Sequence, residues 1–401
     1  MYASSEICLF FLIFPECSIP LDARIKKHNL SLEHVCLTVN RMVEERIESR
    51  QSIVDLFNSQ GLDVAAKLYG IEGDSLSIYG DYLGCQNIVY DYAVDGVDHI
   101  LRVSHRPDRP LELVKAEVHF VDYLAENGAR VSRPVPSTRG KLVETLEVRE
   151  RPFHLVAFIK GRGTRVPDNG YHYREGVSLE VYFRDWGQTL GRMHALAKRY
   201  EPLGPSCRRP DWLSMMEQDH IEGRVPEGFP EVRRRLKDLV AEAGALPREL
   251  GSYGLIHADF NDGNFTLDYD TGDITVFDFD DCCYGWFMYD LACAWEGGVG
   301  RTMFETDVDK RRTFMGRYFE LVMEGYEKEN HLSDVWLERL PLFLKLVEME
   351  SIIAYFQYYG EGSLDSKDQA SLDYLVYCVE NDVPHLGFFD SIFSPENPFS
   401  L

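Results

Sequence analysis

A change in the hydrophobic pattern close to residue 160 constrains the fold more than any other feature of the chain. Before that point, short runs rich in β-branched and aromatic residues alternate with turns that contain Gly or Asp-Gly, a pattern typical of antiparallel strands. After it, hydrophobic residues recur at intervals of three and four, which indicates amphipathic helices. The sequence therefore predicts an α+β architecture of two lobes, with a small sheet lobe followed by a larger, mainly helical lobe.

The sheet lobe is predicted to contain five antiparallel strands and one helix. The predicted strands span residues 76–79, 86–93, 100–103, 142–145 and 153–159. The helix is predicted over 111–127, because its hydrophobic residues share one stripe and Gly128 follows as a stop signal. A helix that leads into the sheet is expected over 41–68, with a break near Gly61.

The same patterns predict the domain organisation. Residues 1–40 show no sustained period and are expected to form an N-terminal extension, and residues 41–156 are expected to form the N-terminal lobe. Residues 157–161 are the expected hinge, and residues 162–401 are the expected helical lobe. The expected helices of that lobe include residues 179–196, 311–326 and 336–358.

Composition argues against two classes of partner. The 401 residues include 42 Lys and Arg but 66 Asp and Glu, and the resulting net charge of -24 repels nucleic acid and anionic membranes. We therefore expect neither as a partner. The acidic balance is compatible with a cationic substrate, although solubility alone is the preferred explanation.

Cysteine usage and the N-terminus both favour a cytoplasmic protein. The nine cysteines are odd in number and lack metal-ligand spacing, so reduced and mostly buried thiols are expected. The apolar run 7–14 ends at Pro15, is too short to span a bilayer and follows no positive charge. It therefore does not predict a signal peptide.

The most informative segment spans residues 255–292. Here His257-Ala258-Asp259 is followed by Asn264 and then by Asp278-Phe279, the order typical of a kinase catalytic loop and metal-binding turn. Phosphoryl transfer requires a carboxylate that orients the attacking hydroxyl and accepts its proton, together with oxygen ligands for magnesium. Each piece alone could serve a turn, but the ordered set makes Asp259 the candidate base and Asn264 and Asp278 candidate metal ligands.

These motifs resemble those of the phosphotransferase family that includes aminoglycoside, choline, homoserine and hydroxylysine kinases. The resemblance is closest over Ile256–Phe265 and Val276–Ala292, with weaker matches over most of the chain from about Leu76. It implies a protein-kinase-like two-lobe fold. It also implies that ATP or GTP, with magnesium, donates a γ-phosphoryl group to a hydroxyl of a small acceptor.

The resemblance assigns roles to individual residues of the catalytic segment. Asp259 would be the catalytic base, whereas Asn264 and Asp278 would bind magnesium. His257 and Asp290 would support the catalytic loop.

The nucleotide side of the site departs from the usual pattern. By resemblance, Ala157 and Ile159 would present backbone groups to adenine. The usual lysine of the third strand is replaced by Arg102, which keeps a positive charge and can bind phosphate bidentately. Its expected partner on the helix is Glu117, with Glu112 as second choice.

For three further residues or segments, a purely structural explanation competes with a functional role. Arg102 could instead be a surface strand residue, and Lys115 is a weaker substitute because it lies on the helix. The Gly80–Asn87 segment is a candidate phosphate-covering loop, but a plain hairpin turn explains its two glycines equally well. His194 shares an apolar helix stripe and is expected to be a satisfied core histidine rather than a catalytic one.

The acceptor is expected to be small rather than a protein. Asp280 stands where protein kinases carry glycine, and Asp290 follows too soon for a peptide-docking segment. Aminoglycosides, amino alcohols, hydroxy amino acids and sugars are left open as acceptors. Asp262, Asp281 and Glu296 could attract an amine together with Asp280, but metal support and helix capping explain them equally well.

A pseudokinase-like protein that binds a nucleotide or a partner without turnover is the alternative function. Arg102 favours it, while the complete set of Asp259, Asn264 and Asp278 opposes it. The sequence does not distinguish ATP from GTP, and it leaves the oligomeric state and the role of the N-terminal extension open.

Overall fold

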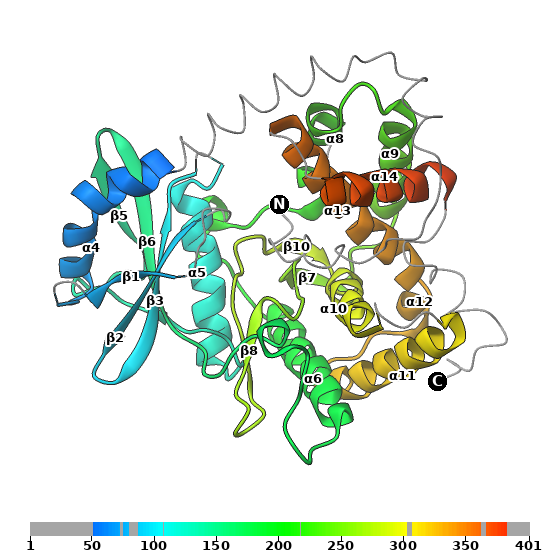
Figure 1. Cartoon of the computed structure of the whole chain (residues 1–401), viewed down its shortest axis with the longest axis horizontal. Helices are drawn as coiled ribbons and strands as arrows, with labels where there is room; N and C mark the ends of the chain where they lie inside the picture. Colours follow the sequence, from blue (N-terminus) through cyan, green and yellow to red (C-terminus); the bar gives the residue numbers. More distant parts are fainter. Residues whose placement is uncertain are drawn as a thin grey trace.

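The computed structural model describes residues 51–382, except 73–74, 80–86, 107, 217, 303–306 and 362–365. The expected extension, the apolar run near the N-terminus and all but one residue of the candidate phosphate-covering loop lie outside the described residues. The described residues form the two lobes that the sequence predicts, with the sheet lobe on the left of Figure 1 and the helical lobe on the right.

A six-stranded antiparallel sheet forms the first lobe. Its strands are β1 (Ser77–Ile78), β2 (Ile88–Val94), β3 (Val97–Ser104), β4 (Pro134–Val135), β5 (Glu144–Val148) and β6 (Arg151–Ile159). Their order is β1-β2-β3-β6-β4, and β5 also pairs with β6. The five predicted strands are confirmed, but the predicted total of five is wrong because β4 adds a sixth. A two-residue strand that begins with proline shows no alternation, so the pattern does not reveal it.

One face of the sheet is covered by the helix over 51–60 and by α4 (Leu62–Leu68). Phe57 of the first helix belongs to one hydrophobic cluster with Leu101 of β3 and Leu155 of β6. The chain turns at Gly61, which confirms the predicted break, and a Cβ there would meet the Phe57 ring at 2.7 Å. Figure 1 shows α4 and α5 on opposite sides of the sheet.

Helix α5 (Leu111–Glu126) covers the other face and contacts both lobes. Val118 packs against Val156 of β6, whereas Leu124 belongs to the core of the helical lobe. The helix ends before Gly128, whose φ of 80° is the left-handed conformation that favours glycine at a helix stop. The predicted helix and its stop are therefore confirmed, and α5 couples the sheet to the second lobe.

The second lobe consists mainly of helices. These are α6 (Leu179–Ala197), α7 (Trp212–Met215), α8 (Gln218–Arg224), α9 (Pro230–Gly244), α10 (Phe287–Thr302), α11 (Val308–Tyr326), α12 (Asp334–Leu337), α13 (Leu340–Glu361) and α14 (Ser366–Asn381). Two small antiparallel pairs complete it, β7 (Tyr253–Ile256) with β10 (Cys283–Trp286) and β8 (Phe265–Leu267) with β9 (Ile274–Val276). These short strands carry the segment that the motif analysis singled out.

The predicted helix over 336–358 is wrong in one respect, because the chain forms α12 and α13 in its place. Pro341 explains the break. Proline has no N–H to bond to the preceding turn, but it is tolerated in the first turn of a new helix. A helix that had reached Leu337 therefore ends, and α13 begins at Leu340.

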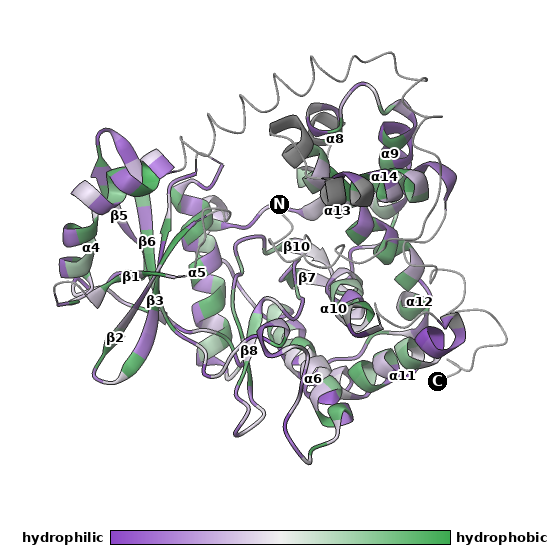
Figure 2. Cartoon of the chain, viewed as in Figure 1, coloured by the Kyte–Doolittle hydropathy of each residue, from purple (hydrophilic) through white to green (hydrophobic). Residues whose placement is uncertain are grey.

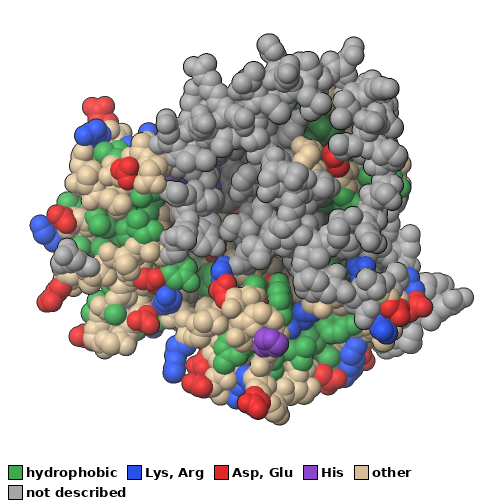
Figure 3. Space-filling model, viewed as in Figure 1, with side chains coloured by type: hydrophobic (Ala, Val, Ile, Leu, Met, Phe, Trp, Pro, Cys, Tyr) green, Lys and Arg blue, Asp and Glu red, His purple; other side chains and the backbone are tan. Residues whose placement is uncertain are grey.

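The hydropathy and charge of the described residues agree with this layered packing. Figure 2 shows β6 as largely hydrophobic between the two helical layers. On the face shown in Figure 3, acidic and basic side chains are interspersed over the sheet lobe rather than gathered by sign.

Among the described helices, none is both long enough and apolar enough to cross a membrane. The described cysteines are free thiols: Cys207, Cys282, Cys283, Cys293 and Cys378.

Candidate active site

The catalytic loop leaves β7 through a strained turn that Asp290 holds. Ala258 has a φ of 68°, a left-handed conformation that is uncommon for a residue with a side chain. The backbone N–H of His257 donates to Asp290 Oδ2 at 2.8 Å, and that of Ala258 donates to Asp290 Oδ1 at 2.7 Å. Asp290 is fully buried at the start of α10, so its carboxylate compensates for this turn from inside the helical lobe.

Asp259 and Asn264 are in direct contact. Asn264 Nδ2 donates to Asp259 Oδ2 at 2.7 Å and to the Asp259 carbonyl oxygen at 2.8 Å. Asn261 Nδ2 donates to the other carboxylate oxygen at 2.7 Å, and Asn261 Oδ1 accepts from the N–H of Gly263 at 2.8 Å. Both oxygens of Asp259 are thus held by neutral donors, which fixes the orientation of its carboxylate.

Asp278 follows β9 beside this loop. The N–H of Phe277 donates to the Asn264 carbonyl oxygen at 2.9 Å, and His257 Nε2 lies 2.9 Å from the Phe277 carbonyl oxygen. These contacts join the metal turn to the catalytic loop. Asp278 itself has a φ of 63°, and its side chain is exposed to solvent.

Neighbouring carboxylates contribute to a raised pKa at two of the candidate residues, Asp259 and Asp278. The pKa of Asp259 is raised well above its usual value, mainly by burial and then by Asp281 and Asp278. The pKa of Asp278 is raised to about 7, mainly by the protein atoms around it and then by Asp280, while Arg102 opposes the shift. Water reaches Asp278 directly and screens part of this effect. A site with this excess of negative charge favours a bound cation.

Arg102 and Glu117 form the ion pair that the sequence predicts. Arg102 Nη1 and Nη2 donate to the two carboxylate oxygens at 2.7 and 2.8 Å, and the two residues are 7% and 1% exposed. The alternative of a surface strand residue is therefore wrong. Burial opposes the charged form of Arg102, but Glu117 and then Asp280 and Asp278 raise its pKa, so the guanidinium interacts electrostatically with the metal turn.

Two further arginines donate hydrogen bonds to the residues that follow Asp278, and the sequence did not indicate either of them. Arg109, just before α5, donates to Asp280 Oδ2 at 3.2 Å and to Asp281 Oδ1 at 2.6 Å. Arg209 donates to the carbonyl oxygens of Asp280 and Cys282, each at 2.6 Å. Neither arginine belongs to a motif, and each contacts residues more than 70 positions away, so no local pattern reveals them.

The structure divides the four acidic residues that were considered together as an amine site. Asp280 and Asp281 are paired with Arg109. Asp262 is buried, and its charge acts on the tyrosines of α6 and α11. Glu296 lies on α10, and burial raises its pKa to about 8. Burial, rather than a neighbouring charge, accounts for that shift.

Glu296 is close to the catalytic loop and to a second carboxylate. Cys293, three residues earlier on the same helix face, contacts the Ala258 carbonyl oxygen at 3.8 Å, directly before Asp259 in sequence. Glu348 of α13 is 4% exposed, and its Oε1 has no hydrogen-bond partner. Burial and then Glu296 raise the pKa of Glu348 well above its usual value. Two acidic side chains of α10 and α13 therefore interact electrostatically, and α10 also contacts the catalytic loop through Cys293.

The hinge residues are placed differently from the other candidates. Ala157 is fully buried in β6, opposite Leu101 on one side and Val135 on the other, so its backbone lies within the sheet. The N–H of Ile159 donates to the Arg133 carbonyl oxygen at 2.9 Å, and its carbonyl oxygen accepts from Ser132 Oγ at 2.5 Å. These contacts involve none of the candidate carboxylates, and the role of Ala157 and Ile159 toward adenine stays a prediction.

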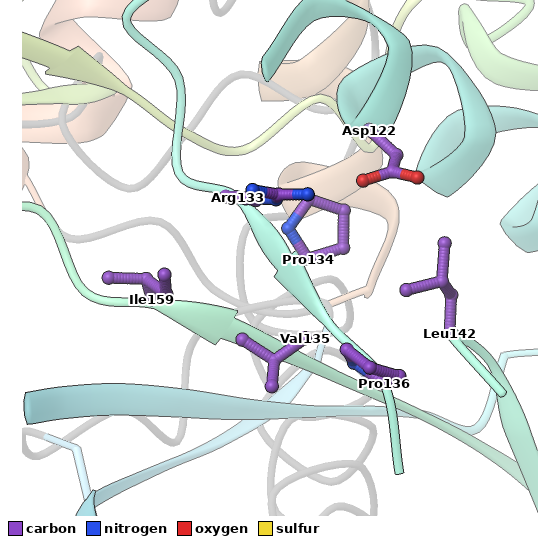
Figure 4. Close-up of a pocket in the computed structure, with 7 residues that line it drawn as sticks. All are labelled: Asp122, Arg133, Pro134, Val135, Pro136, Leu142 and Ile159. Atoms are coloured by element: carbon purple, nitrogen blue, oxygen red, sulfur yellow. The ribbon is translucent and has the colours of Figure 1, made fainter. Parts of the chain in front are cut away.

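A pocket of about 400 Å³ lies beside the hinge. It is lined by Asp122, Arg133, Pro134, Val135, Pro136, Leu142 and Ile159. Figure 4 shows these side chains between α5, β4 and the end of β6. None of Asp259, Asn264 or Asp278 contributes to it, so this pocket is separate from the place where the chemistry is expected.

The remaining candidates, Glu112, Lys115 and His194, do not belong to this site. Glu112 and Lys115 both act electrostatically on His154 in β6, whereas the Arg102 guanidinium pairs with Glu117. His194 is buried between two hydrogen-bond partners, as expected for a satisfied core histidine. The site therefore consists of the catalytic loop, the metal turn and the Arg102–Glu117 pair.

Comparisons with known proteins find relatives over most of the chain. Residues 88–329 match the family model described as phosphotransferase enzyme family. The amicoumacin kinase of Bacillus subtilis (strain 168) is 29% identical over 344 residues, which cover 85% of this chain and 98% of the relative. The homoserine kinase of Caulobacter sp. (strain K31) is 26% identical over 308 residues, which cover 72% and 88%. A solved amicoumacin kinase in complex with AMP-PNP, Ca2+ and Ami has a TM-score of 0.75 at 28% identity, covering 85% of this chain and 98% of that one.

Proposed function

Because this chain belongs to the phosphotransferase enzyme family, we propose that it transfers the γ-phosphoryl group of ATP or GTP to a hydroxyl group of a small amine-bearing acceptor, with magnesium as the metal. The family and the protein-kinase-like fold make the chain a small-molecule phosphotransferase. The nucleotide, the metal and the acceptor class are argued below from its own residues.

The contact between Asp259 and Asn264, beside Asp278, is the observation that carries the proposal. Asp259 is oriented by two amide donors, and its pKa is raised by burial and by neighbouring carboxylates. A carboxylate of raised basicity is better able to accept a proton from an attacking hydroxyl. Asp259 would therefore orient the acceptor hydroxyl and take its proton during transfer.

The residues present fit a magnesium ion. Asn264 donates its amide N–H to Asp259, so its amide oxygen is the atom available to a metal, and Asp278 offers an exposed carboxylate. No cluster of three or more His, Cys, Asp or Glu suited to a metal occurs within the described ranges. Two protein oxygens suit magnesium, which completes its shell with phosphate oxygens and water. When bound, the ion would neutralise charge on the transferring phosphoryl group.

Arg102 would supply the cation on the nucleotide side. Its pair with Glu117 uses two of the five guanidinium N–H groups, and Nε has no partner. The charges of Asp280 and Asp278 act on this guanidinium, so its remaining donors would serve a nucleotide phosphate bound to the metal. Pairing with Glu117 holds the planar group in one orientation, as phosphate recognition requires.

An amine on the acceptor would be recognised by Glu296 and Glu348. Glu296 shares α10 with Cys293, which contacts the catalytic loop, and burial and then the charge of Glu296 raise the pKa of Glu348, an effect that a bound cation would oppose. The relatives named amicoumacin kinase and homoserine kinase are consistent with this class, since both acceptor names denote amine-bearing compounds with hydroxyl groups.

A panel of acceptors tests the proposal. The purified protein would be incubated with ATP or GTP, with and without magnesium, and with homoserine, 1-amino-2-propanol or amicoumacin, and phosphorylated products would be detected by mass spectrometry. The matched control is 1,2-propanediol, which keeps the secondary hydroxyl and replaces the amine by a second hydroxyl. We expect magnesium-dependent transfer to at least one amine and little to the diol.

The outcomes separate the proposal from the pseudokinase-like alternative. Equal transfer to 1-amino-2-propanol and 1,2-propanediol would refute the amine-bearing class while leaving the kinase in place. Nucleotide binding without transfer to any acceptor would favour the protein that binds without turnover. The bidentate Arg102–Glu117 pair weakens that alternative, because the feature that favoured it is part of an ordered charged site.

A further inference from the structure

We propose that His194 is a positioning residue for the catalytic loop and acts through Asp290. This inference rests on the proposed role of Asp259, but its structural basis is a chain of hydrogen bonds outside the reacting groups. This series of hydrogen bonds begins at Lys198, directly after α6, passes through the interface of α6 and α11, and ends at the backbone of His257 and Ala258.

Asp290 is where this chain meets the catalytic loop. Its Oδ2 accepts from the His257 N–H at 2.8 Å and lies 3.0 Å from His194 Nε2, and its Oδ1 accepts from the Ala258 N–H at 2.7 Å. Asp290 is fully buried, so these donors, rather than water, stabilise its negative charge. His194 supplies the side-chain donor, and the other two donors belong to the loop itself.

The His194 ring is fixed on all sides. It is 1% exposed and stacks on Phe287, with ring centroids 4.3 Å apart and an interplanar angle of 20°. Its Nδ1 lies 2.8 Å from the Tyr326 hydroxyl, opposite the nitrogen that faces Asp290. A ring that is stacked and bonded at both nitrogens cannot turn without losing two hydrogen bonds.

In this series of hydrogen bonds, every group donates toward Asp290. Lys198 Nζ donates to Asn330 Oδ1, and Asn330 Nδ2 donates to the Tyr326 oxygen at 2.6 Å. The Tyr326 hydroxyl then donates to His194 Nδ1, and His194 Nε2–H donates to Asp290. A lysine ammonium can only donate and a carboxylate can only accept, so the two ends assign the histidine tautomer. Burial lowers the pKa of His194 although Asp290 opposes the shift, which agrees with a neutral ring.

The consequence for catalysis follows from the backbone of Ala258. Its left-handed φ of 68° costs conformational energy, which the two bonds to Asp290 offset. Without the donor from His194, the buried Asp290 carboxylate would turn toward other donors and release one of those bonds. The turn would relax and displace Asp259, the next residue, from its position beside Asn264 and Asp278. A small displacement of a reacting group lowers turnover more than it lowers binding.

Backbone amide exchange tests this proposal without any substrate. In His194→Phe the ring and its stacking are kept and both hydrogen bonds are lost, so exchange of the amides over 255–260 should be about 10- to 100-fold faster. His194→Gln retains a donor of similar reach and should restore most of the protection. Tyr326→Phe removes the neutral hydrogen bonds of this hydroxyl with His194 and Asn330 and should accelerate exchange by about 2- to 10-fold, which keeps the test available if His194→Phe does not fold.

Tyr318→Phe is the matched control. Tyr318 is also a buried tyrosine of α11, but its hydroxyl donates to the Ala294 carbonyl oxygen at 2.5 Å and not to the chain that ends at Asp290. Its loss should leave the 255–260 amides protected. Unchanged exchange in His194→Phe, or equal acceleration in Tyr318→Phe and Tyr326→Phe, would overturn the proposal.

Kinetics provide the second measurement. With ATP and whichever of homoserine, 1-amino-2-propanol or amicoumacin the wild-type enzyme phosphorylates, His194→Phe should lower kcat by about 10- to 100-fold. Calorimetry with magnesium and AMP-PNP should show nucleotide binding close to wild type. A loss confined to nucleotide binding would refute positioning of Asp259. Faster amide exchange in a protein that phosphorylates no acceptor would retain the positioning of the loop and reject the proposed function.

Discussion

Replacing Arg102 by methionine should separate its structural role from its nucleotide role. The guanidinium makes two hydrogen bonds of 2.7 and 2.8 Å to Glu117, and both residues are buried. Arg102→Met keeps an apolar stem but leaves the Glu117 carboxylate, 1% exposed, without its partner. Breaking a buried ion pair in this way costs about 3–5 kcal/mol of stability. We therefore expect a loss of that size in the free energy of unfolding.

A second substitution should restore stability without restoring function. In Arg102→Met/Glu117→Leu no charge is left unpaired, and apolar replacement of a buried pair is often close to neutral. Most of the lost stability should return. Nucleotide affinity should not return, because the phosphate donor is absent from both variants. Losing a hydrogen bond to a charged group, worth about 1.5–3 kcal/mol, corresponds to a Kd roughly 10- to 100-fold weaker.

Urea unfolding followed by circular dichroism gives the stabilities, and calorimetric titration with magnesium and AMP-PNP gives the affinities. Arg139→Met is the control, because Arg139 pairs with the buried Glu144 in the same lobe but outside the site. It should bind nucleotide normally. Wild-type affinity in the double variant would remove Arg102 from phosphate binding, and an unchanged unfolding free energy in Arg102→Met would refute the reasoning from burial.

The carboxylates and Arg109 give further predictions. Asp259→Asn should lower transfer by about 10²–10⁴-fold while magnesium–nucleotide binding persists in calorimetry, and near-normal turnover would end its assignment as the base. Asp278→Asn should weaken magnesium-dependent nucleotide binding as well as turnover, and undiminished binding would contradict the metal assignment. Arg109→Met should destabilise the protein by about 3–5 kcal/mol in urea unfolding, because it leaves the buried Asp280 without its ion-pair partner, and an unchanged midpoint would argue against the pair. The pKa of Glu296 is raised to about 8, so the residue is largely protonated at pH 7 and loses its proton as the pH rises. The KM for an amine acceptor should therefore fall between pH 7 and 8.5, and Glu296→Gln should abolish this pH dependence.

Features that depend on neighbouring residues could be predicted from the sequence. The runs that became β2, β3 and β6 alternate or are apolar over several residues, and the turn at Asp95-Gly96 has the positive φ values that this dipeptide favours. The helix over 111–127 and its stop at Gly128 were predictable for the same reason. The catalytic loop was recognisable because its residues lie within one short segment. Strand β4 and the break at Pro341 were missed because two residues carry no period and one proline among many apolar residues did not outweigh the helical pattern.

Some charged contacts of the site could be predicted from the sequence, and others could not. The Arg102–Glu117 pair was predictable because a strand and the helix that follows it place both residues at positions that resemblance to the family identifies. Arg109 and Arg209 belong to no pattern, yet they hold the residues after Asp278. The sequence also grouped Asp280 with Glu296 as acidic residues, although an arginine neutralises the first and burial controls the second.

The sequence by itself determined the order of the lobes, most of their strands and helices, and the identity of the catalytic segment, because periodicity, turn chemistry and short spacings are local properties of the chain. Only the tertiary structure decided which distant groups meet. His194 and Asp290 are 96 residues apart, and Arg109 and Asp280 are 171 residues apart. Their contacts depend on how α6, α10 and α11 pack and on where α5 docks. Those arrangements follow from the burial of many apolar side chains at once, so no single stretch of sequence encodes the hydrogen bonds that hold Asp290 and the metal turn in place.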